Sequence, residues 1–236
     1  MTATLSASVD SPPRAPLTAA GIPELLRVLG DVPAERVLLD PPPGQATEED
    51  LIRRVDGDDK ILCELVDGTL VEKAMGYREG LLALAIGAFL REFVNARNLG
   101  MVAGADAMLR MMGGNIRLPD VSYSAWSDVP GGKVPTQAVG RFPATLAIEV
   151  LSKGDTRREM QKKYREFFDS GTRQVWEINP DSRTVAIYNV PDAEPAKILQ
   201  ESEILSGGPL LPGFELPLAR LFAELDRQAG QGGQAV

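Results

Sequence analysis

Leu146-Ala147-Ile148-Glu149-Val150-Leu151 is the stretch that most strongly indicates the fold, because it combines a buried strand with a single carboxylate. A short apolar run rich in branched side chains is typical of a strand inside a sheet. A carboxylate in such a run is strongly unfavourable unless it is paired or bound to a metal ion. Glu149 is therefore a candidate functional residue, and the alternative is a structural ion pair with an arginine or lysine.

A second candidate acid lies in Leu118-Pro119-Asp120-Val121, at the start of another predicted strand. Strands are expected over Asp120–Ser124 and Thr145–Leu151. If these two strands are neighbours, the carboxylates of Asp120 and Glu149 can reach one ion. The alternative interpretation of Asp120, as a turn residue, is equally compatible with the sequence.

The segment from Thr156 to Gly171, just after this second strand, is predicted to be a helix. Thr156 and Glu159 form a capping-box pattern at its start, and Gly171 is placed to end it. Four apolar side chains share one helical face and should pack on the sheet: Met160, Tyr164, Phe167 and Phe168.

Helical geometry distinguishes the two adjacent lysines of this segment. At about 100° per residue, Lys163 lies roughly 60° from Met160 and about 40° from Phe167 around the helix axis. Lys162 points nearly opposite, into solvent. We therefore expect Lys163, and not Lys162, to reach over the edge of the sheet towards the two carboxylates.

The other predicted elements surround this unit. Helices are expected over Ile22–Leu29, from Thr47 onward, over Glu79–Arg97 and over Leu216–Leu225, and strands over Ile61–Val66, Thr69–Lys73, Met101–Val102, Ala107–Met112, Arg173–Ile178, Arg183–Val190 and Ile198–Leu199. Asp67-Gly68 is predicted to be the hairpin turn between the first two strands. Strands flanking two long helices indicate an α/β or α+β core with a mixed sheet. We expect one domain over residues 21–226, with disordered tails at 1–20 and 227–236.

Composition excludes several classes of active site. The chain has 236 residues, no histidine and one cysteine. Catalysis by Ser-His-Asp or Cys-His groups and zinc sites built on histidine or several cysteines are therefore excluded within one chain. Any metal ion must be hard and bound by oxygen, such as Mg²⁺ or Mn²⁺.

Cys63 is expected to be a buried strand residue, and a single cysteine is compatible with the reducing cytoplasm. No stretch is long and apolar enough to predict a membrane span.

Charge is distributed unevenly along the chain. The net charge of −8 argues against a broad nucleic-acid-binding surface, but residues 153–166 carry a local positive surplus. Lys153, Arg157 and Arg158 are candidates for contacts with a nucleic-acid backbone; a solvated helix face is the equal alternative. Glu64 is a further candidate acid, since it interrupts an apolar strand, and an outward-facing position on an edge strand is its alternative.

These motifs together resemble the Uma-two family of the PD-(D/E)XK nuclease superfamily. The resemblance runs over roughly residues 60–190 and comprises Cys63-Glu64-Leu65-Val66-Asp67-Gly68-Thr69-Leu70-Val71, Pro119-Asp120-Val121, Ile148-Glu149-Val150-Leu151-Ser152, Lys163, Gly171 and Val175-Trp176-Glu177-Ile178-Asn179-Pro180. It implies a restriction-endonuclease-like core, a mixed β-sheet flanked by helices, and Mg²⁺-dependent phosphodiester cleavage. It also implies that Asp120 and Glu149 are the acids of the motif.

Two positions depart from the pattern of that superfamily. Leu151 stands where a lysine usually follows the acid by two residues, so the positive charge must come from elsewhere, and Lys163 matches the lysine that this family places in the next helix. Tyr77-Arg78-Glu79 stands where many relatives have a histidine, so any role of that histidine is lost or taken by Glu79.

Three functions remain open from the sequence. The first is a DNA endonuclease in which Asp120 and Glu149 bind Mg²⁺ or Mn²⁺, Glu64 is a further candidate acid, and Lys163 orients the water or stabilises the phosphate. The second is a binding or accessory protein that keeps the nuclease fold without catalysis. A glycosidase with two carboxylates is the third and weakest, since only 6% of residues are aromatic. A homodimer would suit cleavage of both strands.

Overall fold

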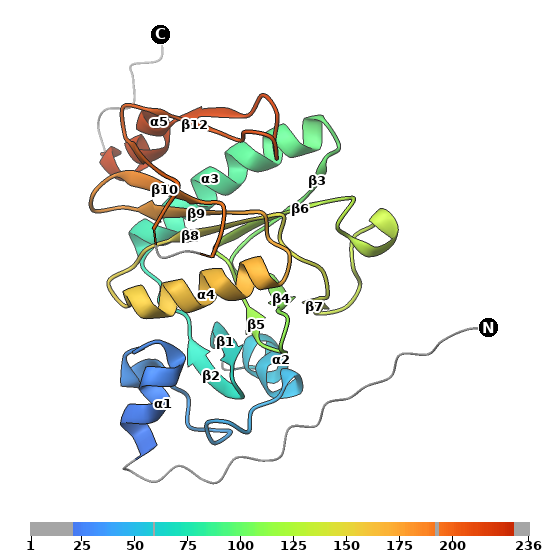
Figure 1. The fold of residues 1–236 in the computed structure, drawn as a ribbon, viewed down its shortest axis with the longest axis vertical. Coiled ribbons are helices and arrows are strands. Elements are labelled where there is room, and N and C mark those ends of the chain that lie inside the picture. The colour runs from blue at the N-terminus through green and yellow to red at the C-terminus, as the bar shows by residue number, and fades with distance from the viewer. Residues whose placement is uncertain (1–20, 59, 192–193, 229–236) are drawn as a thin grey trace, which may run out of the picture.

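The computed structural model describes residues 21–58, 60–191 and 194–228. Its elements form layers, with the long helix α4 lying between two β-sheets (Figure 1). The tail expected at 1–20 lies outside the described residues, and so do residues 229–236 of the tail expected at 227–236. Within the described residues no helix is long and apolar enough to cross a membrane.

The larger sheet has six strands in the order β11-β10-β9-β8-β6-β3. Their bounds are β11 (Lys197–Gln200), β10 (Thr184–Tyr188), β9 (Gln174–Asn179), β8 (Leu146–Val150), β6 (Val121–Ala125) and β3 (Gly100–Ala103). Strands β8 and β9 are parallel, and every other neighbouring pair is antiparallel. The mixed sheet is thus confirmed, and so is the pairing of the two acid-bearing segments, in which Val121 is opposite Ile148.

Helices cover both faces of this sheet (Figure 1). On one face lie α3 (Tyr77–Ala96), α5 (Leu218–Phe222) and the small hairpin of β12 (Ile204–Ser206) and β13 (Glu215–Pro217). Ile86 and Leu90 of α3 pack there in one cluster with Ile148 and Trp176. On the other face lies α4 (Arg157–Asp169).

The predicted apolar stripe of α4 packs on the sheet as expected. Met160, Tyr164 and Phe167 form one buried cluster with Ala147 of β8 and Val175 of β9. Phe168 is partly buried at the margin of the same cluster. The stripe leaves the side of α4 that carries Lys163 turned towards the second sheet.

This second sheet has five strands in the order β2-β1-β5-β4-β7. They are β2 (Thr69–Glu72), β1 (Cys63–Val66), β5 (Ile116–Arg117), β4 (Met108–Arg110) and β7 (Val139–Gly140). The helices on this side are α1 (Ile22–Leu29), α2 (Glu48–Asp56) and the short 3-10 helix η2 (Ala34–Arg36). Two further 3-10 helices, η3 (Pro130–Gly132) and η4 (Ala223–Asp226), complete the set. A separate sheet and its two-residue strands β5 and β7 were not anticipated, because two residues show no periodicity to read.

At most turns and helix ends, the backbone conformation is the one that the sequence predicts. Asp67 and Gly68 have φ of 49° and 70°, which are the two positive values that a tight hairpin turn requires. Gly171, with φ of 104°, ends α4 and donates its N–H to the carbonyl of Phe168. The C-terminal helix is shorter than predicted: α5 gives way to η4, and Glu215–Pro217 is a strand.

Candidate functional site

The alternation of side chains along β8 directs Glu149 towards α4. Ile148 and Val150 belong to the cluster beneath α3, whereas Ala147 belongs to the cluster beneath α4. Glu149 shares the face of Ala147, since side chains two residues apart lie on the same side of a strand. Glu149 is 3% exposed, which confirms the expectation of a buried carboxylate.

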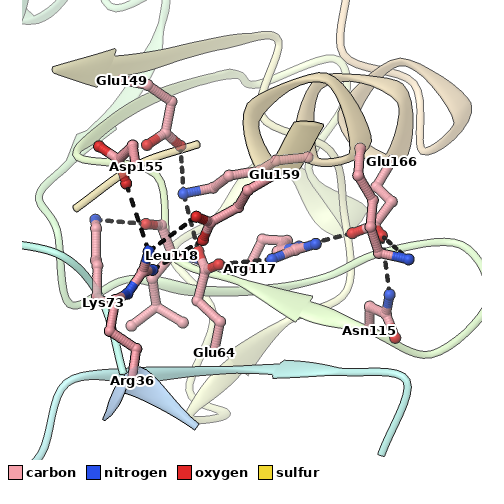
Figure 2. Close-up of polar contacts among 12 residues, drawn as sticks. Arg36, Glu64, Lys73, Asn115, Arg117, Leu118, Glu149, Asp155, Glu159 and Glu166 are labelled. Carbon is pink, nitrogen blue, oxygen red and sulfur yellow. Dashed lines mark hydrogen bonds and ion pairs between the residues drawn. The ribbon is translucent and has the colours of Figure 1, made fainter. Parts of the chain in front are cut away.

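Lys163 extends from α4 to the carboxylates of Glu149 and Glu64 at once; Figure 2 labels these two glutamates. Its ammonium lies 2.8 Å from Oε1 of Glu149 and 3.0 Å from Oε1 of Glu64. Lys162, in contrast, is partly exposed and pairs with Asp67 and Glu166. The helical argument that selected Lys163 is therefore correct about direction. The alternative interpretation of Glu149, as the ion-pair partner of an arginine or lysine, is also correct, because Lys163 is that partner.

Glu64 lies in an interior strand, so its interpretation as an outward-facing edge residue is wrong. Strand β1 has β2 on one side and β5 on the other, and Glu64 is 4% exposed. Oε2 of Glu64 accepts from Arg117 at 2.7 Å, and Oε1 accepts from the backbone N–H of Leu118 at 2.9 Å. Both carboxylate oxygens of Glu64 are occupied by protein donors. Glu64 therefore positions Lys163 and Arg117.

Asp120 directly precedes β6 and joins that strand to the end of β8. Its Oδ2 accepts the backbone N–H of Val150 at 2.7 Å, and its Oδ1 lies 2.8 Å from the ammonium of Lys73. The turn-residue and functional interpretations are thus both compatible with its position. Asp120 is also close enough to Glu149 for its charge to raise the pKa of that carboxyl.

Two basic residues of this centre, Lys73 and Arg117, were missed in the sequence. Arg117 is 1% exposed and donates to Glu64 and, through Nε at 2.6 Å, to Glu166. It stands between the apolar residues Ile116 and Leu118, so the reasoning applied to Glu149 would have found it. Lys73 carries a weaker signal, because it comes at the end of a strand, where a lysine is ordinarily exposed.

The two buried glutamates differ in how easily they lose a proton. Burial would raise the pKa of Glu64, but Lys163 and Arg117 outweigh it and hold the pKa well below its ordinary value. Burial raises the pKa of Glu149 to about 8, since Lys163 offsets only part of the desolvation and Asp120 adds repulsion. Lys163 has a raised pKa, because Glu149 and Glu64 outweigh its burial, and it remains an ammonium.

The predicted metal site is not assembled as a cluster of acids. Within the described residues, no three acidic or cysteine side chains come together in a way that could hold a metal ion. Two features still suit a hard cation. Oε1 of Glu149 is buried and accepts no hydrogen bond, so its contact with Lys163 is an ion pair only. The donors of Asp120 and Glu149 are carboxylate oxygens, the ligands that Mg²⁺ and Mn²⁺ prefer.

A pocket of about 710 Å³ opens beside this centre. Lys73 forms part of its wall together with Ser152 and Lys153, which follow Glu149 in the chain. Glu79 lines the same pocket. The pocket therefore gives solvent a route to the residues around Asp120.

The three basic residues proposed for backbone contacts occupy different settings. Lys153 is exposed and lines the pocket. Arg158 pairs with Asp31 at 2.6 Å, and Arg157 contacts Glu177 and the hydroxyl of Tyr188. A role for all three in binding nucleic acid stays a prediction, and Lys153 has the most favourable position.

Comparison with solved structures shows that this arrangement of helices and strands occurs in another protein. The chain is similar to a crystal structure described as a "putative nuclease belonging to DUF820" from Anabaena variabilis ATCC 29413. The two share 20% sequence identity and a TM-score of 0.61, and the alignment covers 69% of this chain and 90% of the other. This likeness shows a shared fold, and it agrees with the predicted mixed α/β core.

The family is shown by the sequence match itself. The model of the Uma2 family, described as "Putative restriction endonuclease", matches residues 49–219. The chain therefore belongs to the Uma2 family, which confirms the resemblance to the Uma-two proteins. A search of curated proteins found no match. Family and fold together support a nuclease.

Proposed function

We propose that the protein is a divalent-metal-dependent endonuclease that hydrolyses phosphodiester bonds in DNA. The observation that carries the proposal is the meeting of Glu149, from β8, with the ammonium of Lys163 at 2.8 Å, beside Asp120, which directly precedes the adjacent strand β6. Carboxylates from neighbouring strands and a nearby cation are what hydrolysis of a charged diester requires. A substrate would approach through the pocket that is lined by Lys73, the ion-pair partner of Asp120.

In this proposal each side chain has a distinct role. Asp120 and Glu149 would hold Mg²⁺ or Mn²⁺. When bound, such an ion polarises the phosphoryl oxygen and lowers the pKa of water. Lys163 would donate to a phosphate oxygen or orient the attacking water. Glu64 and Arg117 position Lys163 through the contacts already described, and Lys153 would contact the backbone beside the pocket.

A nicking assay on supercoiled plasmid with Mg²⁺ tests the proposal. We expect the wild-type protein to nick the plasmid and Glu149→Ala and Asp120→Asn to lose at least about a hundredfold in rate, the scale of losing a preorganised charge. Lys162→Gln is the matched control, because it removes a neighbouring charge that faces away from Glu149. Equal nicking by all four proteins would assign the activity to a contaminant.

The second candidate is an accessory protein that binds without cleaving. It is favoured by the lack of a three-acid cluster within the described residues and by Leu151 at the usual lysine position. Titration with Mn²⁺ separates the two functions. Site-specific binding that Asp120→Asn abolishes would favour the endonuclease, whereas DNA binding unaffected by metal and without cleavage would favour the accessory role.

We further propose that the chain acts as a homodimer in the cytoplasm. One centre per chain suits cleavage of one strand, so a two-fold pair would cut both. Size-exclusion chromatography with light scattering checks the oligomeric state, and a monomer at every concentration would remove the dimer from the proposal.

A further inference from the structure

Lys73 is a second buried ammonium in the candidate centre, and it lies against the acid expected to bind the metal ion. It follows directly on β2 and is 8% exposed. Its Nζ lies 2.8 Å from Oδ1 of Asp120 and donates to the carbonyl of Leu118 at 2.6 Å (Figure 2 shows the contact with Leu118). The hydrogen bond fixes the ammonium beside the carboxylate.

The position of Lys73 affects the oxygen that a cation needs. Oδ2 of Asp120 is occupied by the backbone N–H of Val150, which leaves Oδ1 for a metal ion. Lys73 lies at this oxygen. An ammonium and a divalent cation on one oxygen would repel each other strongly in so buried a setting. The two positive groups therefore compete for Asp120.

Without an added ion, the centre already has one cationic side chain for each of its acids. The acids are Asp120, Glu149 and Glu64, and the cationic side chains are Lys73, Lys163 and Arg117. A divalent cation can enter most easily if one cationic side chain leaves.

Lys73 is the cationic group best placed to leave. Lys163 contacts two carboxylates of the centre, and Arg117 bridges Glu64 and Glu166. Lys73 pairs with one carboxylate and already lines the pocket, together with the exposed residues Lys60 and Lys153.

We propose that Lys73 is an internal counter-ion of Asp120 that a divalent cation displaces, and that the released ammonium moves into the pocket. There it joins Lys60 and Lys153 and contacts the phosphodiester. The inference rests on the proposed function, because it needs a metal ion at Asp120. It also explains how a centre can keep its acids buried and neutralised before the ion arrives.

Binding of Mn²⁺ without nucleic acid tests the inference. Lys73→Gln removes the charge and keeps an N–H donor for the carbonyl of Leu118. We expect this variant to bind Mn²⁺ roughly tenfold more tightly than the wild type, the scale of coupling between two competing ligands. The amount of free Mn²⁺ is read by electron paramagnetic resonance. Lys60→Gln is the matched control: it removes one charge from the same pocket and should change affinity by less than about twofold.

The outcomes separate this inference from the proposed function. Equal or weaker Mn²⁺ binding by Lys73→Gln, with binding still lost in Asp120→Asn, would overturn the displacement of Lys73 and leave the metal site intact. If no protein, wild type included, binds Mn²⁺ in a way that depends on Asp120, the metal-dependent function fails as well.

A measurement on the wild-type protein does not depend on the folding of a variant. Lysine acylation followed by mass spectrometry reports how accessible each amine is. We expect saturating Mg²⁺ to increase the labelling of Lys73 severalfold and to leave the labelling of Lys162 unchanged, because Lys162 pairs with Asp67 away from the centre. Labelling of Lys73 that does not respond to Mg²⁺ would contradict its release.

Discussion

At the scale of single residues, the two adjacent lysines of α4 offer a direct comparison. Lys163 is 5% exposed and forms ion pairs with two buried glutamates, whereas Lys162 is partly exposed. Lys163→Gln should lower the free energy of unfolding by about 3–5 kcal/mol, because it leaves buried carboxylates with less compensation. Lys162→Gln should cost less than about 1 kcal/mol. Urea unfolding measures both losses of stability. Equal losses would show that the buried ion pairs of Lys163 contribute no more to stability than the partly exposed pairs of Lys162.

The titration of Glu149 predicts how stability depends on pH. Its pKa rises from 4.5 to about 8 on folding, so between these values the folded chain holds a proton that the unfolded chain has released. The contribution of this group to stability is therefore complete below pH 4.5 and is lost as the pH rises towards 8.

The measurement compares urea midpoints of the wild type and Glu149→Gln across this range, in the presence of a chelator. The variant has no such proton to lose, so the difference between the two proteins should grow in its favour with rising pH. Parallel curves would show that Glu149 titrates normally in the folded chain.

At the scale of elements, the start of α4 depends on one hydroxyl. Thr156 accepts from the N–H of Glu159 and donates to the carbonyl of Gly30 at 2.5 Å, so it caps α4 and holds it against the segment after α1. Thr156→Ala should cost about 1–2 kcal/mol, at the upper end for a lost cap. Thr156→Ser keeps the hydroxyl and should recover most of that loss in urea unfolding. Failure of serine to restore stability would assign the effect to the methyl group.

The predicted capping box at this helix is only half formed. Thr156 accepts from the N–H of Glu159, but the carboxylate of Glu159 is bound by Arg36 instead. The sequence could not show this, because Arg36 lies far away along the chain. By contrast, α2 has the full box, in which Thr47 and Asp50 satisfy each other.

At the scale of the whole molecule, the segment before the family-matched region is part of the folded core. Arg36 holds both oxygens of Glu159, each at 2.8 Å. Val32 and Val37 pack in a buried cluster with Val66 and Val71 of the β1–β2 hairpin. The helix α4 is thus attached both to the larger sheet and to the N-terminal segment.

A double-mutant cycle measures this long-range attachment. Arg36→Met and Glu159→Gln should each destabilise the protein, and their combination should cost less than the sum, with a coupling of about 1–3 kcal/mol. Urea unfolding of the three variants and the wild type supplies the four free energies. Additive effects would mean that the two side chains do not support each other in solution.

Much of the local structure follows from residues close together in sequence. The bounds of α1, the Asp67-Gly68 turn, the position of the α4 N-cap at Thr156, the end of α4 and the burial of Cys63 all agree with their predictions. Burial raises the pKa of the Cys63 thiol to about 12, which is consistent with an inert core residue. Hydrophobic periodicity and turn geometry act over a few residues, so the sequence displays them directly.

The sequence by itself determined that Glu149 is buried and which lysine of α4 faces it, because apolar neighbours and helical spacing are local properties. Only the tertiary structure decided that Glu64 supports Lys163, that Arg117 bridges Glu64 and Glu166, and that Lys73 lies on Asp120. These partners come from separate strands and a helix, and a buried charge is satisfied by whichever group the fold brings near it. The packing of distant segments against each other decides which group becomes the partner, and no local pattern in the chain shows it.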